Sequence, residues 1–306
     1  MTNKIIVNGI FYLFLTLFFL YIFIKEKQIV KKINIKKEKF SNKLILKFGV
    51  QNELLKKIIT KVIFYTETIA TAIILVLIIQ KFYLGNFLVP TGSMIPEIVP
   101  KDRLFGNMVV YKFTKPKRED IVVFKEPIEN KVLYTKRLMG LPGEKINIEN
   151  ERLLINGKVV SERKYLDMGE IRGKTWIIPK KGDKITIQPL KNYNAMFEER
   201  NIDIEEIQKY LLATPGAIAE ILPQIEFKVN GEKTGMLLEL IEDKEIIKKL
   251  IDGESIEIVL DKDFYMMLGD NTAGSYDSRM WGFVSEARIK GEIFFRFWPL
   301  NRITVL

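Results

Sequence analysis

The stretch Pro90-Thr91-Gly92-Ser93-Met94-Ile95-Pro96 decides how the rest of this chain is interpreted. It follows a long apolar run and opens a region rich in short β-like segments. The flanking prolines restrict the backbone and the glycine permits a close approach, so Ser93 would lie on an exposed turn. The Ser93 amide and the Thr91 hydroxyl could both point at an oxyanion. Taken alone, the stretch is equally compatible with an ordinary surface turn.

The chain has no histidine and no cysteine among its 306 residues, which limits the chemistry open to Ser93. A serine hydroxyl needs a base to become a nucleophile, and a Ser-His-Asp triad is impossible here. Thiol catalysis, disulfides and zinc sites of the Cys/His type are also excluded. The carboxylates show no spacing typical of a loop metal site, so we predict no metal and no cofactor. A lysine held neutral by burial is the remaining base.

The candidate lysine is Lys136, in Tyr134-Thr135-Lys136-Arg137-Leu138-Met139-Gly140. It follows a β-like run, so alternation would place Lys136 and Arg137 on opposite faces of a strand. One of the two must then face the more buried side, and only the lysine can readily lose its charge. Burial would lower the pKa of Lys136 into a useful range. The alternative is two exposed basic side chains on an edge strand.

A third segment, Leu268–Gly282, is dense in small and hydrogen-bonding residues. Within it, Ser275 could orient the lysine amine. Asp277 and Arg279, two positions apart, could form an ion pair that holds the loop. As an isolated segment it could equally be a polar turn.

Two apolar runs precede these segments, over residues 5–24 and roughly 62–79. Each approaches the length of about 20 residues that spans a bilayer. We predict transmembrane helices at 1–24 and 62–84, joined by a basic cytoplasmic loop at 25–61. The alternatives are a cleaved signal peptide for the first run and a buried soluble helix for the second.

The positive charge is concentrated between the two runs. Twelve lysines and three glutamates lie in residues 25–61, which accounts for nine of the ten net positive charges. A basic loop beside membrane helices marks the cytoplasmic side and can contact anionic lipid. Residues 85–306 would then lie outside the cytoplasm, and we do not expect nucleic-acid binding.

From residue 85 onward, short β-like runs alternate with turn signals. Residues 192–222 and 235–251 look helical or loop-like, with Asp203 as a plausible helix start. The sequence therefore predicts a mainly-β domain over 85–306 that contains an inserted α+β segment at about 190–255. The predicted β-like runs are 108–113, 120–124, 131–139, 145–148, 153–155, 184–188, 226–229, 255–260, 264–268 and 291–297.

Together the segments resemble bacterial type I signal peptidase (leader peptidase), serine peptidase family S26. The resemblance rests on two spans, the Pro-Thr-Gly-Ser-Met-x-Pro box, residues 115–124, the Tyr-x-Lys-Arg-x-x-Gly-x-Pro-Gly box, and the Gly-Asp-Asn box that continues into Ser-x-Asp-Ser-Arg-x-Trp-Gly. It implies a β fold shared with self-cleaving repressors. It also implies a membrane-bound endopeptidase that removes signal peptides from exported preproteins through an acyl-enzyme.

The resemblance also implies a role for each matching residue. Ser93 would be the nucleophile and Lys136 the general base. Thr91 would contribute to the oxyanion hole, Ser275 would position Lys136, and Asp277 with Arg279 would stabilise the site. Candidates for lining the substrate pockets are Ile95, Leu133 and Tyr134.

The implied location is the bacterial cytoplasmic membrane, as a multi-pass protein with its catalytic domain on the extracytoplasmic face. The implied partners are preproteins with Ala-x-Ala sites, membrane lipid and the secretion translocase. This chain departs from the family pattern at Glu97, Glu119, Glu144 and 272–274, none of which removes a catalytic group.

Three rival interpretations remain open from the sequence. One is a self-cleaving repressor-type protease, although such proteins carry a DNA-binding domain and not membrane spans. Another is a catalytically silent, membrane-anchored β domain that binds exported chains. The third is a lipid-binding scaffold that uses the basic loop.

Overall fold

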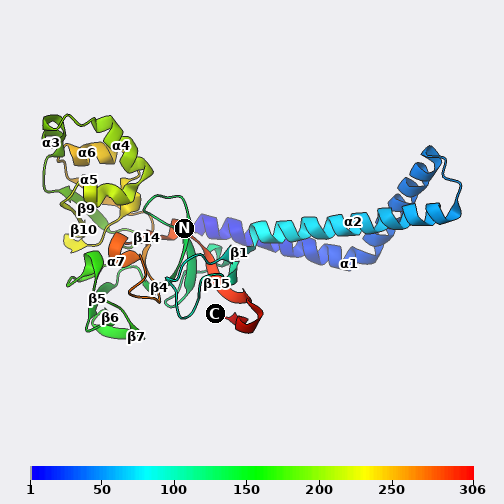
Figure 1. The fold of residues 1–306 in the computed structure, drawn as a ribbon, viewed down its shortest axis with the longest axis horizontal. Coiled ribbons are helices and arrows are strands. Elements are labelled where there is room, and N and C mark those ends of the chain that lie inside the picture. The colour runs from blue at the N-terminus through cyan, green and yellow to red at the C-terminus, as the bar shows by residue number, and fades with distance from the viewer. Residues whose placement is uncertain (1) are drawn as a thin grey trace. The chain divides into compact units, whose positions relative to one another are not determined.

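The computed structural model describes the backbone of residues 2–306 and every side chain except a set within the two N-terminal helices. The chain divides into two compact units, one ending at Leu84 and the other comprising Gly85–Leu306. In Figure 1 the first unit is coloured blue to cyan, and the second runs through green and yellow to red.

The first unit is a pair of long helices, α1 (Thr2–Lys47) and α2 (Glu53–Phe82). Most of the predicted loop at 25–61 is therefore helical, and the turn is confined to residues 48–52. No glycine or proline interrupts residues 25–47, and lysine, glutamate and leucine favour the helix. The two helices contact each other where Ser41 Oγ lies 2.8 Å from Thr60 Oγ1.

Among the described residues, neither helix has a stretch that is both long and apolar enough to cross a bilayer. Many side chains of the predicted first span at 1–24 lie outside the described set. The two predicted spans therefore stay predictions.

The second unit is built on a large, mainly antiparallel sheet with strand order β1-β2-β15-β3-β4-β13-β14, in which β16 also pairs with β15. The predicted runs at 120–124, 131–139, 264–268 and 291–297 are confirmed as β3, β4, β13 and β15. The strand bounds are β1 (Leu84–Leu88), β2 (Arg103–Asn107), β3 (Ile121–Lys125), β4 (Leu133–Gly140), β13 (Phe264–Leu268), β14 (Val284–Ser285), β15 (Ile289–Trp298) and β16 (Thr304–Val305).

The predicted run at 108–113 is wrong, because this segment contains a 3-10 helix at Val110–Lys112. The Asn107 side chain accepts hydrogen bonds from the amides of Val109 and Val110, at 3.1 and 3.2 Å. Such a local bond turns the chain away from the strand that the apolar residues favour.

Two four-stranded sheets complete the β structure, with orders β7-β6-β5-β8 and β11-β10-β9-β12. Asn156-Gly157 and Asn230-Gly231 have positive φ throughout and close hairpins in each sheet, as the turn signals predict. The bounds are β5 (Lys145–Glu149), β6 (Arg152–Ile155), β7 (Lys158–Lys164), β8 (Trp176–Ile177), β9 (Lys184–Pro189), β10 (Ile225–Val229), β11 (Glu232–Thr234) and β12 (Ile256–Val259).

The inserted segment contributes four short helices beside β9 and β10 (Figure 1). They are α3 (Tyr193–Glu199), α4 (Ile204–Ala213), α5 (Ile218–Ile221) and α6 (Lys244–Ile251). Asp203 begins α4 as predicted, since its side chain accepts a hydrogen bond of 2.8 Å from the Glu205 amide. The remaining 3-10 helices are η2 (Gly169–Ile171), η3 (Pro215–Ala217), η4 (Leu238–Ile241), η5 (Glu286–Arg288) and η6 (Leu300–Arg302).

Candidate active site

The turn that carries Ser93 is anchored by its apolar neighbours. Met94 and Ile98 are buried in a small cluster with Leu104 of β2 and Ile121 of β3. Burying these side chains favours one position of the turn and keeps Ser93 at the edge of the core, where it is 8% exposed.

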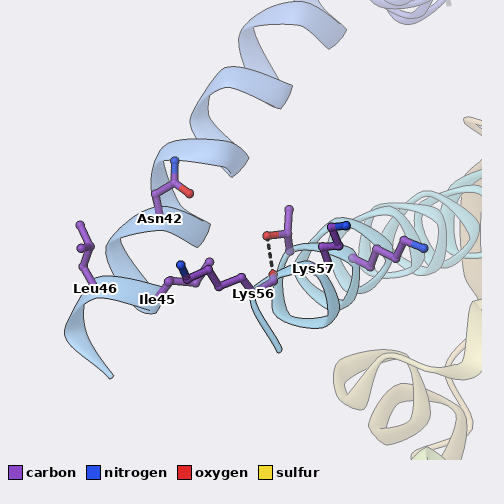
Figure 2. A pocket seen from close by; sticks show the side chains of 7 residues that line it. Asn42, Ile45, Leu46, Lys56 and Lys57 are labelled. Atoms are coloured by element: carbon purple, nitrogen blue, oxygen red, sulfur yellow. Dashed lines mark hydrogen bonds between the residues drawn. The ribbon is translucent and has the colours of Figure 1, made fainter. Parts of the chain in front are cut away.

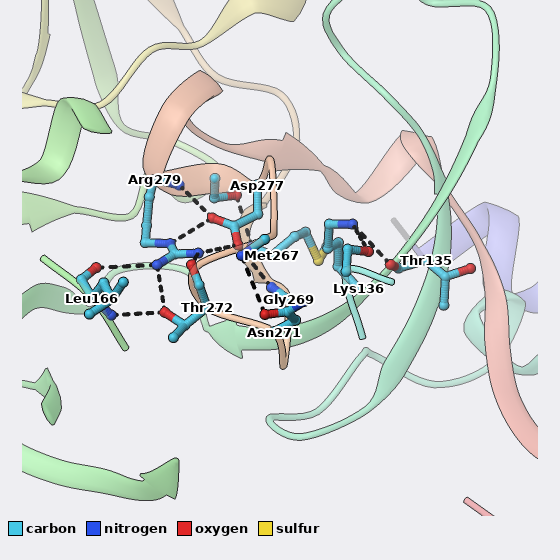
Figure 3. Close-up of polar contacts among 12 residues, drawn as sticks. Thr135, Lys136, Leu166, Met267, Gly269, Asn271, Thr272, Asp277 and Arg279 are labelled. Atoms are coloured by element: carbon cyan, nitrogen blue, oxygen red, sulfur yellow. Dashed lines mark hydrogen bonds and ion pairs between the residues drawn. The ribbon is translucent and has the colours of Figure 1, made fainter. Parts of the chain in front are cut away.

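Lys136 lies in the middle of β4 and pairs with Val122 of β3. Its side chain runs to the serine turn, where Nζ is 2.8 Å from Ser93 Oγ (Figure 3). Nζ also lies 3.3 Å from the Thr135 carbonyl. The structure therefore brings together the two residues that the sequence singled out, 43 positions apart.

The surroundings of Lys136 favour the neutral amine. Burial lowers its pKa to about 8, although the negative charges of Asp277 and Asp270 act in the opposite direction. A burial effect of this kind arises because the ammonium loses its hydration shell. At pH 7 about a tenth of such lysines are neutral, compared with less than a thousandth for a free side chain.

Arg137, the next residue, is also buried, at 6% exposure. It keeps its charge by a two-pronged ion pair, with Nε and Nη2 at 2.8 and 2.6 Å from the Asp270 carboxylate. Both basic residues are therefore buried, whereas the alternation argument required this of only one. The sequence interpretation missed Asp270, although its place in the Gly-Asp-Asn motif was a usable signal.

Asp277 and Arg279 form a fully buried ion pair, with Arg279 Nη2 2.8 Å from Asp277 Oδ2. Asp277 begins α7 (Ser278–Trp281). Its Oδ2 also accepts the Gly269 amide at 3.0 Å. Arg279 donates to the Thr272 carbonyl at 2.8 Å (Figure 3). The pair therefore ties β13, the following loop and α7 into one rigid piece.

Ser275 is buried beside this piece, and its hydroxyl has no hydrogen-bond partner among the described residues. The structure thus gives no bond between Ser275 and Lys136. Gly269 packs directly against Ser275. A Cβ at this glycine would lie 2.1 Å from Ser275 Oγ and 2.6 Å from the Ser93 carbonyl oxygen. Only glycine fits between the two serine segments.

Asn271 joins the third segment to the serine turn and was missed by the sequence interpretation. Its amide donates to the Ser93 carbonyl at 3.0 Å. Its side-chain Nδ2 donates to the Gly92 carbonyl, also at 3.0 Å. These two bonds fix the turn at the carbonyl groups of two successive residues, Gly92 and Ser93.

The other predicted site residues surround this centre. Thr91 is exposed on the turn. Ile95 is 39% exposed and lies over Gly92, where an added Cβ would be 2.9 Å from Ile95 Cδ1. Leu133 is 49% exposed at the start of β4. The Tyr134 ring centre lies 5.3 Å from Lys136 Nζ.

Within the described part of the chain, one edge of β4 is unpaired beside Ser93 and Lys136, here called the dyad. Strand β3 pairs with β4 from Leu133 to Arg137, but β13 reaches β4 only between Arg137 and Gly140. Among the residues that the structure describes, those at 133–136 thus have a strand on one side alone. An extended peptide can add to such an edge.

A hollow of about 620 Å³ lies elsewhere, between the two long helices (Figure 2). It contains none of the predicted site residues. The residues that line this hollow are Asn42, Ile45, Leu46, Lys56, Lys57, Thr60 and Lys61.

Among the described residues, no group of carboxylates is placed to hold a metal ion.

A buried serine–lysine pair on a mainly-β scaffold defines a serine hydrolase that works without histidine. The profile of the family described as "Signal peptidase, peptidase S26" matches residues 62–298, and the chain belongs to this family. It is therefore a serine endopeptidase of the signal peptidase I type.

Two related sequences agree with this assignment. The signal peptidase I of Buchnera aphidicola subsp. Baizongia pistaciae is 32% identical over 73% of this chain and 72% of its own length. That of Aquifex aeolicus is 26% identical over 72% of this chain and 78% of its own. Among solved structures, a signal peptidase I from Enterococcus faecalis is 23% identical in sequence. The match covers 58% of this chain and 97% of the Enterococcus chain, and its TM-score is 0.25.

Proposed function

We propose that Ser93 is the nucleophile and Lys136 the general base of this signal peptidase. The observation that carries the proposal is the 2.8 Å separation of Lys136 Nζ and Ser93 Oγ within a buried site. The lowered pKa of Lys136, caused by burial, supplies the neutral amine that a base must be.

The reaction proceeds in two steps. Neutral Lys136 takes the Ser93 proton while Oγ attacks the scissile carbonyl, and the tetrahedral oxyanion forms. The C–N bond then breaks, the lysine ammonium protonates the leaving amine, and the mature protein departs. A water then gives a proton to Lys136 and attacks the remaining ester. The bond between the acyl carbon and Ser93 Oγ breaks, Lys136 returns the proton to Oγ, and the signal peptide leaves with a new carboxylate.

Several groups support these steps. The Ser93 amide and the Thr91 hydroxyl stabilise the oxyanion. Asp277 and Arg279 hold the loop, and Ser275, whose hydroxyl has no partner in the described part of the chain, assists the lysine amine. Thr91 and Ser275 are assigned from the family motifs and not from a hydrogen bond.

The substrate adds as an extended strand along residues 133–136 of β4. Ile95, Leu133 and Tyr134 border the shallow pockets that select small residues at an Ala-x-Ala site. The support is their position around the dyad and the partial exposure of Ile95 and Leu133.

The catalytic domain works on the extracytoplasmic face of a bacterial cytoplasmic membrane. The support is the apolar run at 5–24, the second run from 62, and the lysines between them. Trp298 and Leu300 are 49% and 68% exposed and suit contact with the lipid headgroup region. Lipid and the secretion translocase are the proposed membrane partners.

The test is cleavage of a preprotein with an Ala-x-Ala site by the full chain in detergent, followed by sequencing of the product N-terminus. Wild type is compared with Ser93→Ala and Lys136→Ala. A cut at the Ala-x-Ala boundary that both substitutions abolish supports the dyad. Cleavage that survives either substitution refutes it, and no cleavage by folded wild type refutes the function.

A further inference from the structure

The inserted segment at about 190–255 contacts the loop between β3 and β4, here called the β3–β4 loop (126–132). This loop leads directly into Leu133 at the start of the open edge of β4. Because the loop and β4 are continuous, contacts that position the loop also position residues 133–136 beside the dyad.

The β3–β4 loop is closed internally around the Glu126 carboxylate, which is 1% exposed. Its oxygens accept backbone hydrogen bonds from Ile128, Glu129, Lys131 and Val132, between 2.6 and 3.3 Å. Burial raises the pKa of Glu126, but these four bonds outweigh it and hold the pKa below its usual range. The loop is therefore a compact unit held together by its own hydrogen bonds.

The first contact with the insert is a close backbone approach. Gly216 in η3 donates its amide to the Ile128 carbonyl at 3.0 Å. A Cβ at Gly216 would lie 2.3 Å from Ile128 Cγ2 and 3.2 Å from Ile128 Cα. The contact therefore requires glycine at this position.

The second contact runs through Arg288, which is 6% exposed. Its Nη1 donates to the Glu126 carbonyl and to Asn130 Oδ1, both at 3.0 Å. The other side of the guanidinium binds two carboxylates of the insert, Glu239 at 3.1 Å and Glu242. Carboxylates of the insert thus position Arg288, and Arg288 in turn binds the β3–β4 loop.

We infer that the insert positions the substrate-binding edge of β4, and that Gly216, Glu239, Glu242 and Arg288 are positioning residues for this edge. The inference rests on the proposed addition of substrate to residues 133–136. It assigns the insert a role in binding the extended substrate and not in the chemistry at Ser93.

The test uses the full chain in detergent with three variants. Gly216→Ala forces the first contact apart, and Gly216→Ala combined with Ile128→Ala removes the clashing methyl and restores room. Glu242→Gln weakens the second contact. Its matched control is Glu257→Gln in β12, which loses an exposed ion pair with Lys184 of β9, away from the loop.

We expect Gly216→Ala to raise KM for the preprotein about fivefold with kcat nearly unchanged, because a displaced edge weakens substrate binding. Hydrogen exchange of the amides at 126–136 should accelerate, and the double variant should recover both values. Glu242→Gln should also raise KM and accelerate the exchange of these amides, whereas Glu257→Gln should leave both values unchanged.

Folded variants with the KM and the exchange of wild type overturn the inference, as does a fall in kcat alone. If wild type itself does not cleave the preprotein, the proposed function fails. The exchange measurement still decides whether the insert controls the edge.

Discussion

At the scale of single residues, the proposed chemistry depends on whether the Lys136 amine is protonated. The Lys136 amine is buried against Ser93, and two nearby carboxylates limit how far its pKa falls. In the proposed mechanism only the neutral amine accepts the serine proton, so the fraction of neutral lysine sets the fraction of active enzyme.

We therefore expect kcat/KM to rise with pH through about 8, which is the pKa of Lys136 in the folded protein. Since the neutral form is the active one, the rise should be roughly tenfold from pH 7 to pH 9. The measurement uses a peptide substrate without groups that titrate in this range. A flat or falling profile over this interval would contradict the assignment of Lys136 as base.

Single residues were also the features most accessible to sequence analysis. The proximity of Ser93 and Lys136 could be predicted because the absence of histidine and cysteine removes the other common nucleophile–base pairs. Asp270 could not be predicted as the partner of Arg137, because their contact spans 133 positions and depends on how β4 pairs with β13.

At the scale of elements, the site is the meeting of a turn, a strand and a loop. Asn271 connects the loop after β13 to the serine turn through two hydrogen bonds. Each element is positioned by buried contacts of its own, so this bridge determines their mutual alignment.

Replacing Asn271 by Asp should lower kcat by about tenfold or more, because a small displacement of a nucleophile has large kinetic effects. The variant keeps Oδ1, which accepts from the Gly274 amide, but places a carboxylate oxygen against the Gly92 carbonyl. Asn192→Asp, which retains the helix-capping oxygen of α3, is the control. An unchanged kcat in a folded Asn271→Asp variant would show that the bridge has no kinetic role.

The elements differed in how well the sequence predicted them. Alternating or continuous apolar runs predicted β3, β4, β9, β10, β13 and β15, since each is buried on at least one face. The run at 108–113 failed because the Asn107 side chain competes for the backbone. Strand β7 was missed because its side chains are exposed or half-exposed, which leaves no hydrophobic pattern.

At the scale of the whole molecule, the described apolar core belongs to the second unit. Among the described residues, the two clusters of buried apolar side chains consist of residues beyond Leu84. Every predicted site residue also lies in the second unit. The catalytic domain therefore has the contacts that an independently folding domain requires.

A fragment of residues 84–306 should fold with a cooperative transition and cleave a short soluble peptide within about threefold of the full chain, since no dyad contact is lost. Cleavage of a preprotein embedded in vesicles should fall much further, because the proposed membrane spans are missing. Thermal unfolding followed by circular dichroism and peptide cleavage assays measure the two properties. A fragment that is unfolded, or folded but inactive on the short peptide, would contradict the separation.

The buried amine has a consequence for inhibition. A compound that placed an anionic group beside Lys136 Nζ would stabilise the ammonium, and the base would be disabled without any reaction at Ser93. Reagents that alkylate thiols or imidazoles have no target in this protein. Inhibitors of this enzyme could therefore be selected for their effect on a proton equilibrium. Their potency would grow as the pH falls through about 8 and would level off below it.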